Sequence, residues 1–417
     1  MRSRAILAPR TTATRDLGRR KLGDEGENDQ DREEKQALHH FTAAGGAWVD
    51  TVSFRPVSLR RHGHNGTLGP GQKGWLWYVP ATVERDWTGA GGGVTDTAIN
   101  RPTSSATGSP NLAPDVAAAL AAPSPPSELT VEAAGIPFHA LAWGAADAPP
   151  VLLLHGVTSA ARTWWRVGPA VAAAGFRVVA PDLPGHGETK HWLGHYRFRD
   201  NAADLVAFAR AAGLERPDLR IVGHSWGAMT AAAMPAAGLV PAALVLLDPP
   251  AIPLAALAAM LEDPTEGAYD DLDEAVATVG RLNPTWSHGD VLAKAEGLTQ
   301  FDVAAVRDIL TKNGDFDGGL GALGDPAARA TRVWLIRGDP LFGGYVPDAL
   351  LPDFGARLGP ERIITIAGAP HSPHRTHPEA LVAAVLRALE GLCLPPSGPQ
   401  QGQIFVGGLL GRKGARI

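Results

Sequence analysis

Cysteine is almost absent from this chain, because Cys393 is the only one among 417 residues. A single thiol excludes intramolecular disulfides and clusters of thiolate metal ligands, and it favours a reducing, cytoplasmic location. The sequence also lacks a long apolar run. The best candidate, residues 231–247, is interrupted by Pro235 and Pro241 and falls short of the ~20 residues of a membrane-spanning helix. We therefore expect a soluble protein with no membrane span.

Positive charge is not in excess either, since the formal net charge is -5. A protein that binds nucleic acid through its phosphates needs a broad basic surface, so nucleic-acid binding is disfavoured. Residues 1–21 are rich in Arg and Thr but lack the apolar core of a secretory signal, which requires roughly 7 to 15 residues. We expect no export by that route.

The composition changes along the chain and divides it into parts. Residues 1–126 combine a mixed-charge opening with segments rich in Gly, Ser, Thr and Pro, which favours a disordered or loosely docked extension. From residue 127 to residue 394, short apolar runs alternate with helical patterns, as in a parallel α/β domain. Within this domain, residues 249–330 show helical periodicity without buried-strand patterns. Residues 395–417 are expected to form a C-terminal tail.

The most informative motif is Gly223-His224-Ser225-Trp226-Gly227, which follows the apolar run 219–222. The pattern G-x-S-x-G at a strand end places a serine on a sharp strand-to-helix turn, with glycines where side chains would collide with backbone. Ser225 is therefore the predicted nucleophile. The backbone N–H of Trp226 can point at an oxygen that becomes negative during the reaction, and its indole is expected to border the acyl pocket.

A serine hydroxyl is a poor nucleophile at neutral pH, so Ser225 needs a general base. His371 lies nearest to the end of the last predicted strand, residues 363–366, and is the preferred base. His374 and His377 compete with it but lie farther along the chain.

The base needs a carboxylate that fixes its tautomer and stabilises its cation. Asp339 follows the predicted strand 333–336 and is the preferred acid. Asp248, at the end of the preceding strand 243–247, is the alternative.

Five features carry a resemblance to a known family. They occur in this order: His155-Gly156, Asp182-x-x-Gly185-x-Gly187-x-Thr189, Gly223-x-Ser225-x-Gly227, Gly338-Asp339, and His371 after the final strand. With the chain order Ser, Asp, His, residues 128–392 resemble an α/β-hydrolase-fold protein of the cap-bearing kind. The resemblance implies an α/β fold with a doubly wound, mostly parallel eight-stranded sheet. It also implies that the helices of residues 249–330 form a cap over the ligand crevice.

The resemblance also implies a chemistry. In this family, the residue after the His-Gly pair and the residue after the nucleophile supply the oxyanion-hole amides, which are Val157 and Trp226 here. Ser225 would attack a carbonyl while His371 takes its proton, and water would then hydrolyse the acyl-enzyme. No cofactor is required, and the histidines and acids show no convincing metal-ligand spacing.

The expected activity is that of a serine hydrolase acting on a small-molecule ester, lactone or related acyl substrate. The alternatives are a C–C bond hydrolase, a perhydrolase or an aminopeptidase of the same fold, or a non-catalytic ligand-binding protein. Serine rather than aspartate at position 225 argues against epoxide hydrolase chemistry, which needs a carboxylate nucleophile in this fold. His155 and His186 are expected to be structural. The sequence leaves the oligomeric state open.

Overall fold

The computed structural model describes residues 112–263 and 266–390. The predicted tail, and the predicted extension up to residue 111, lie outside the described residues. An eight-stranded sheet in the order β1-β2-β4-β3-β5-β6-β9-β10 forms the centre. Its strands are β1 (Ser127–Ala133), β2 (Ile136–Trp143), β3 (Pro150–Leu154), β4 (Arg177–Pro181), β5 (Arg220–His224), β6 (Ala243–Leu247), β9 (Arg332–Arg337) and β10 (Ile363–Thr365).

The sheet is mostly parallel. β2 runs antiparallel to both β1 and β4, and the remaining neighbours pair in parallel. The central strands are continuous apolar runs because both of their faces are covered. In β3, Leu152 and Leu154 face one core cluster, whereas Val151 and Leu153 face the other. The predicted doubly wound sheet is confirmed.

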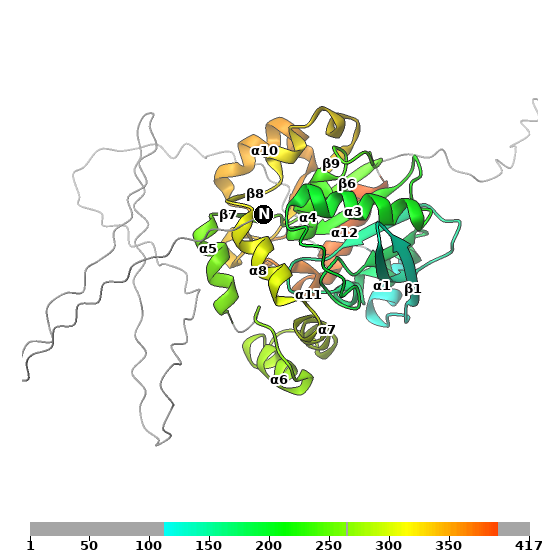
Figure 1. Cartoon of the computed structure of the whole chain (residues 1–417). Coiled ribbons are helices and arrows are strands. Elements are labelled where there is room, and N and C mark those ends of the chain that lie inside the picture. Colours follow the sequence, from blue (N-terminus) through cyan, green and yellow to red (C-terminus); the bar gives the residue numbers. More distant parts are fainter. Residues whose placement is uncertain (1–111, 264–265, 391–417) are drawn as a thin grey trace, which may run out of the picture. The chain divides into compact units, whose positions relative to one another are not determined.

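Helices cover both faces of the sheet (Figure 1). On one face lie α3 (Phe198–Ala211), α4 (Trp226–Ala233) and α10 (Leu351–Leu358). On the other lie α1 (Pro114–Ala121), α2 (Val167–Ala173) and α12 (Pro378–Glu390). α1 buries Val116 and Leu120 in the core, so the packed body includes residues ahead of the predicted start at residue 127.

A helical insertion follows β6, as predicted. It contains α5 (Leu254–Ala259), α6 (Leu272–Leu282), α7 (His288–Thr299), α8 (Val303–Lys312) and α9 (Leu320–Leu323), with a short antiparallel pair of β7 (Ala251–Ile252) and β8 (Phe316–Asp317). α6 and α7 lie side by side (Figure 1) and share a small apolar cluster around Val279, Val291 and Leu298. Short helical turns complete the described chain: η1 (Ala161–Trp164), η2 (Met260–Glu262), η3 (Pro326–Ala330), η4 (Pro340–Phe342), η5 (Asp348–Leu350), η6 (Pro360–Arg362) and α11 (Pro373–Thr376).

The helix α7 is tied to the body of the domain by charged side chains. Asp290 accepts hydrogen bonds from Trp165 Nε1 at 3.1 Å and from the Arg166 guanidinium. Six residues further along, Glu296 Oε2 lies 2.9 Å from Arg162 Nε. These contacts fix α7 against the segment that follows β3.

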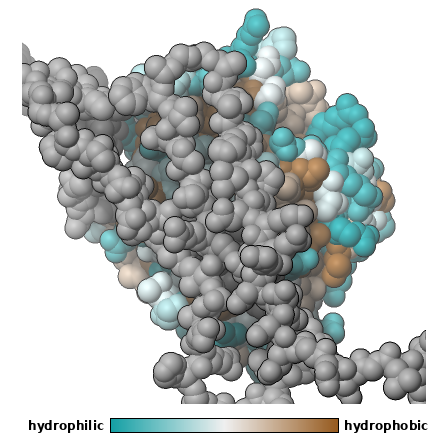
Figure 2. Space-filling view, turned by 90° about the vertical axis from the view of Figure 1, so that its left-hand side faces the viewer, coloured by the Kyte–Doolittle hydropathy of each residue, from teal (hydrophilic) through white to brown (hydrophobic). Residues whose placement is uncertain are grey.

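The surface of the described part is mixed in character. Where its residues are visible in Figure 2, hydrophilic and hydrophobic side chains are interspersed. Among residues 112–263 and 266–390, no helix combines the length and the apolar character needed to cross a membrane.

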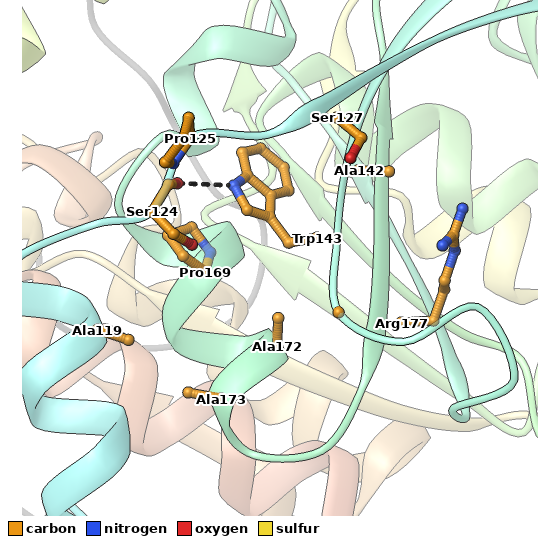
Figure 3. A pocket seen from close by; sticks show the side chains of 11 residues that line it. Ala119, Ser124, Pro125, Ser127, Ala142, Trp143, Pro169, Ala172, Ala173 and Arg177 are labelled. Carbon is orange, nitrogen blue, oxygen red and sulfur yellow. Dashed lines mark hydrogen bonds between the residues drawn. The ribbon is translucent and has the colours of Figure 1, made fainter.

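A surface cavity of about 380 Å³ lies beside β2 and α2 (Figure 3). Trp143 lines it and donates from Nε1 to the carbonyl of Ser124 at 3.2 Å. Arg177, the first residue of β4, also lines this cavity. The cavity therefore lies at the amino ends of the parallel strands. Ser225 follows the carboxyl end of β5, so it lies at the opposite edge of the sheet.

Candidate active site

Ser225 lies on a sharp turn between β5 and α4. Its φ of 54° is in the left-handed region, which a residue with a side chain adopts only where its surroundings hold it. A Cβ on Gly223 would lie 2.4 Å from the carbonyl oxygen of Gly227, and one on Gly227 would lie 2.4 Å from that of His155. Both glycines are therefore required for the backbone to pass, as the motif predicts.

His371 joins Ser225 to a carboxylate. His371 Nε2 lies 2.9 Å from Ser225 Oγ, and its Nδ1 lies 2.7 Å from Asp248 Oδ2. The two competing histidines have other partners. His374 Nε2 contacts Thr163 Oγ1, and His377 Nδ1 contacts Thr376 Oγ1. Of the three candidate bases, His371 is therefore the one that contacts the serine.

The expected pairing of Asp339 with His371 is wrong. Asp339 caps the turn η4 with one carboxylate oxygen, which accepts from Leu341 N at 3.0 Å, and its other oxygen accepts from Gly368 N at 3.1 Å. The Asp339 carboxylate is thus committed to backbone amides, one in its own turn and one at Gly368. Asp248, the alternative, has the contact with the histidine.

Backbone amides hold Asp248 in place. Its Oδ1 accepts from Gly338 N at 2.9 Å and its Oδ2 from Tyr345 N at 3.0 Å, and the residue is fully buried. The Asp248 backbone itself has a φ of 43°, outside the usual range for a residue with a side chain. These bonds direct the carboxylate at His371 Nδ1.

Two aromatic residues for which the sequence predicts no catalytic role, Tyr345 and His224, hold His371. Tyr345 stacks on its ring, with centroids 3.8 Å apart and an interplanar angle of 22°. His224 Nε2 donates to the His371 carbonyl at 2.9 Å. Burial lowers the pKa of His224 well below its usual value, so this ring is neutral. His224 directly precedes Ser225, which is the signal that could have drawn attention to it.

His155 and His186 make backbone contacts, as expected for structural residues. His155 Nδ1 donates to Gly156 O at 2.7 Å, and its Nε2 accepts from Leu183 N at 2.9 Å. His186 Nδ1 lies 3.1 Å from the carbonyl of Pro184. Burial lowers the pKa of His155 and lowers that of His186 to about 3.

The indole of Trp226 does not border an accessible pocket, so that expectation is wrong. Trp226 is fully buried in the core, and its ring lies 5.1 Å from the ring of His186. The reason is the direction of α4, which turns the side chain of its first residue towards the interior of the domain.

The residues expected to form an oxyanion hole lie on either side of Ser225. Trp226 is the first residue of α4, where backbone N–H groups have no partner within the helix. A Cβ on Gly156 would lie 3.1 Å from Ser225 Cβ, so the loop that carries Val157 packs directly against the serine.

The cap contributes charge next to this loop. Lys294, on α7, donates from Nζ to Thr158 O at 3.1 Å, to Thr158 Oγ1 at 3.0 Å and to Glu266 Oε2 at 2.8 Å. Burial lowers the pKa of Lys294, while the Glu266 carboxylate partly offsets this effect. Within the described ranges, no group of three or more His, Cys, Asp or Glu side chains is arranged to hold a metal ion.

Comparison with known proteins identifies the family. The model of the "Alpha/beta hydrolase family" matches residues 151–385, more than half of the chain. The chain belongs to the α/β hydrolase family. In this α/β hydrolase, Ser225, Asp248 and His371 follow the strands β5, β6 and β10, and so meet at the carboxyl edge of the sheet, where such folds bind ligands.

Individual relatives are more distant. Epoxide hydrolase A of Mycobacterium tuberculosis is 36% identical over 106 residues, which are 25% of this chain and 32% of that protein. Lipase LipV of the same organism is 28% identical over 274 residues, 61% of this chain and 98% of that protein. The alignment with the epoxide hydrolase therefore spans about a third of the length of that relative.

A solved structure shows the same fold. E-2-(acetamidomethylene)succinate hydrolase superposes with a TM-score of 0.55 at 21% identity, over 63% of this chain and 99% of its own. At this identity, the likeness describes the shared α/β hydrolase architecture alone.

Proposed function

We propose that this α/β hydrolase is a serine hydrolase that cleaves a small ester, lactone or related acyl substrate through an acyl-enzyme on Ser225. The observation that carries the proposal is the continuous relay from Ser225 Oγ to His371 Nε2 at 2.9 Å and from His371 Nδ1 to Asp248 Oδ2 at 2.7 Å. A hydroxyl, an imidazole and a carboxylate in this order activate the hydroxyl for attack on a carbonyl.

The first step forms the acyl-enzyme. His371 Nε2 takes the Ser225 proton as the oxygen attacks the substrate carbonyl, and Asp248 stabilises the imidazolium that forms. The amides of Val157 and Trp226 stabilise the oxyanion. The carbonyl bond to the leaving group then breaks, and His371 gives its proton to that group.

Water reverses the roles in the second step. It enters beside His371, which takes a proton from it while the hydroxide attacks the acyl carbonyl. The tetrahedral intermediate collapses, the ester bond to Ser225 breaks, and the proton returns to Ser225 Oγ. The product is the free carboxylic acid.

The relatives that carry the name epoxide hydrolase do not shift this proposal. Opening an epoxide through a covalent intermediate produces an alkyl-enzyme, and water can release the alcohol only when that intermediate is an ester of a carboxylate. Position 225 carries a serine hydroxyl, which would form an ether that water cannot cleave under mild conditions. The lipase name of the relative that aligns over nearly its whole length accords with ester cleavage.

A fluorophosphonate probe tests the proposal, because it reacts only with an activated serine. We expect the full chain to be labelled at Ser225 and to hydrolyse members of a panel of p-nitrophenyl esters, lactones and thioesters of increasing acyl length. Ser225→Ala should lose both signals. Folded wild-type protein that is neither labelled nor active on any member would instead support a non-catalytic ligand-binding protein.

A further inference from the structure

Thr158, the residue after Val157, has an unfavourable backbone conformation. Its φ is 56°, and it is fully buried. The left-handed region is rarely adopted by a β-branched residue, because the branched Cβ crowds the backbone. A residue persists in such a conformation only where its surroundings hold it there.

The surroundings that hold Thr158 come from the cap. Lys294 Nζ donates to both the carbonyl oxygen and the hydroxyl of Thr158, at 3.1 and 3.0 Å. Glu266 Oε2 contacts the same hydroxyl and also accepts from Lys294 Nζ at 2.8 Å. The loop side adds one contact, because Thr158 Oγ1 lies 2.6 Å from Val157 O.

Lys294 is built into this position. It is only 3% exposed, and an ammonium group has three donors, all of which are accounted for by the two Thr158 oxygens and Glu266. One turn along α7, a Cβ on Gly297 would lie 3.1 Å from Ser159 Cα, so the helix backbone packs directly on the loop backbone. The loop and α7 therefore pack backbone against backbone, and Lys294 adds the charged contacts that hold Thr158 at this interface.

We propose that Lys294 is a positioning residue that holds Thr158, and through it the amide of Val157, in the geometry that binds the oxyanion. The proposal rests on the proposed function, in which Val157 donates to that oxyanion. Under this proposal, the contact between the cap and the loop that carries Val157 is required for the acyl-transfer step. The cap would then affect the rate of the chemistry as well as the choice of substrate.

Replacing the ammonium group tests the proposal. Lys294→Met keeps an unbranched, largely apolar side chain but removes all three hydrogen bonds. We expect kcat on an ester identified by the panel to fall on the order of 10- to 100-fold, because a displaced oxyanion donor acts mainly on the transition state. KM should stay within about threefold, since ground-state binding does not use this amide. Lys312→Met, which removes an exposed lysine paired with Asp308 on α8, is the matched control and should retain wild-type kinetics.

A second substitution separates positioning from general stability. Glycine adopts a φ of +56° without the steric cost that threonine has. Adding Thr158→Gly to Lys294→Met should therefore recover at least fivefold of the lost kcat, although the hydroxyl contacts are also gone. Loss of packing stability alone would lower the folded fraction but not kcat per folded molecule, so it would leave no loss of kcat for the glycine to recover. If Lys294→Met does not fold, Lys294→Gln replaces it in the same comparison.

Rates of fluorophosphonate labelling at Ser225, measured per folded molecule, distinguish the outcomes. Slow labelling in Lys294→Met with partial recovery in the double variant supports the proposal. Wild-type labelling and wild-type kcat in Lys294→Met would overturn it while leaving the proposed hydrolase function intact. A wild-type chain that is not labelled at all would overturn both.

Discussion

Asp248 Oδ2 lies 2.7 Å from His371 Nδ1, although 123 residues separate the two in the chain. Asp248 follows the central strand β6, and His371 follows β10, the strand at the far edge of the sheet. Two backbone amides and the stacked ring of Tyr345 hold the pair. The position of the acid is thus set by the strand order, which brings the carboxyl ends of distant segments together.

The acid assignment predicts opposite effects for two substitutions. Asp248→Asn should reduce kcat on the order of 10³- to 10⁴-fold, because an amide cannot hold His371 in the tautomer that accepts the Ser225 proton. Asp339→Asn should leave kcat within a few-fold, since that carboxylate contacts only backbone amides in the structure. Steady-state kinetics on one ester compare kcat of the two variants with that of the wild type. Melting curves of both variants control for folding. Normal turnover in Asp248→Asn would exclude this acid.

The fold and the sharp turn that carries Ser225 could be predicted from the sequence, because both depend on local patterns. Buried strands such as residues 151–154 are continuous apolar runs, and the glycines beside Ser225 are demanded by collisions with backbone within a few ångströms. The choice between Asp248 and Asp339 was not predictable in this way. Both follow adjacent strands, and the turn before Pro340, not the strand pattern, directs one carboxylate away from the histidine.

The residues that hold the site in place could not be predicted from the sequence, for a different reason. Lys294 and Thr158 are 136 residues apart, and no motif marks this lysine within its helix, α7. Tyr345 lies in an irregular segment between two short turns, where neither periodicity nor spacing indicates which ring it covers. Such contacts depend on how the cap and the loops pack, which is a property of the whole domain.

The stacking of Tyr345 on His371 predicts that removing the Tyr345 ring lowers kcat more than removing its hydroxyl does. Tyr345→Phe keeps the aromatic face and should retain kcat within about threefold, because the stack supplies the orientation. Tyr345→Ala should lower kcat about tenfold, since a less restrained imidazole spends less time aligned with Ser225. Comparing kcat of the two variants on the same ester is the measurement. Equal losses in both would assign the effect to the hydroxyl instead.

The turn at Ser225 predicts that a single methyl group at Gly227 is damaging. A Cβ there would lie 2.4 Å from the carbonyl oxygen of His155, which is backbone and cannot move aside cheaply. Gly227→Ala should lower the melting temperature and reduce kcat at least 100-fold, because the turn that presents the serine must shift.

Gly355 offers a matched control within α10. A Cβ on Gly355 meets no atom within 4 Å, and alanine is the better helix former by roughly 0.5 to 1 kcal/mol. Gly355→Ala should therefore raise the melting temperature slightly and leave kcat unchanged. If Gly227→Ala behaved like Gly355→Ala, the steric account of the turn would be refuted.

The buried imidazole of His186 predicts a specific loss of stability in acid. Its pKa is about 3 in the folded protein, because burial disfavours the cation, whereas an unfolded histidine has a pKa of about 6.5. Between these values the unfolded chain binds one more proton than the folded chain does. The stabilising contribution of neutral His186 is therefore complete above pH ~6.5 and is lost progressively as the pH falls towards 3.

Replacing this histidine should flatten the pH dependence. His186→Asn removes the titrating group but keeps an N–H near the position of Nδ1, which contacts Pro184 O. Between pH 6 and pH 4, the free energy of unfolding of the wild type should fall more steeply than that of the variant, by up to about 1.4 kcal/mol per pH unit, the value for one proton. Urea unfolding at pH 7.5, 6, 5 and 4 measures both slopes. Parallel curves for the two proteins would show that the His186 imidazole is not kept neutral by its burial.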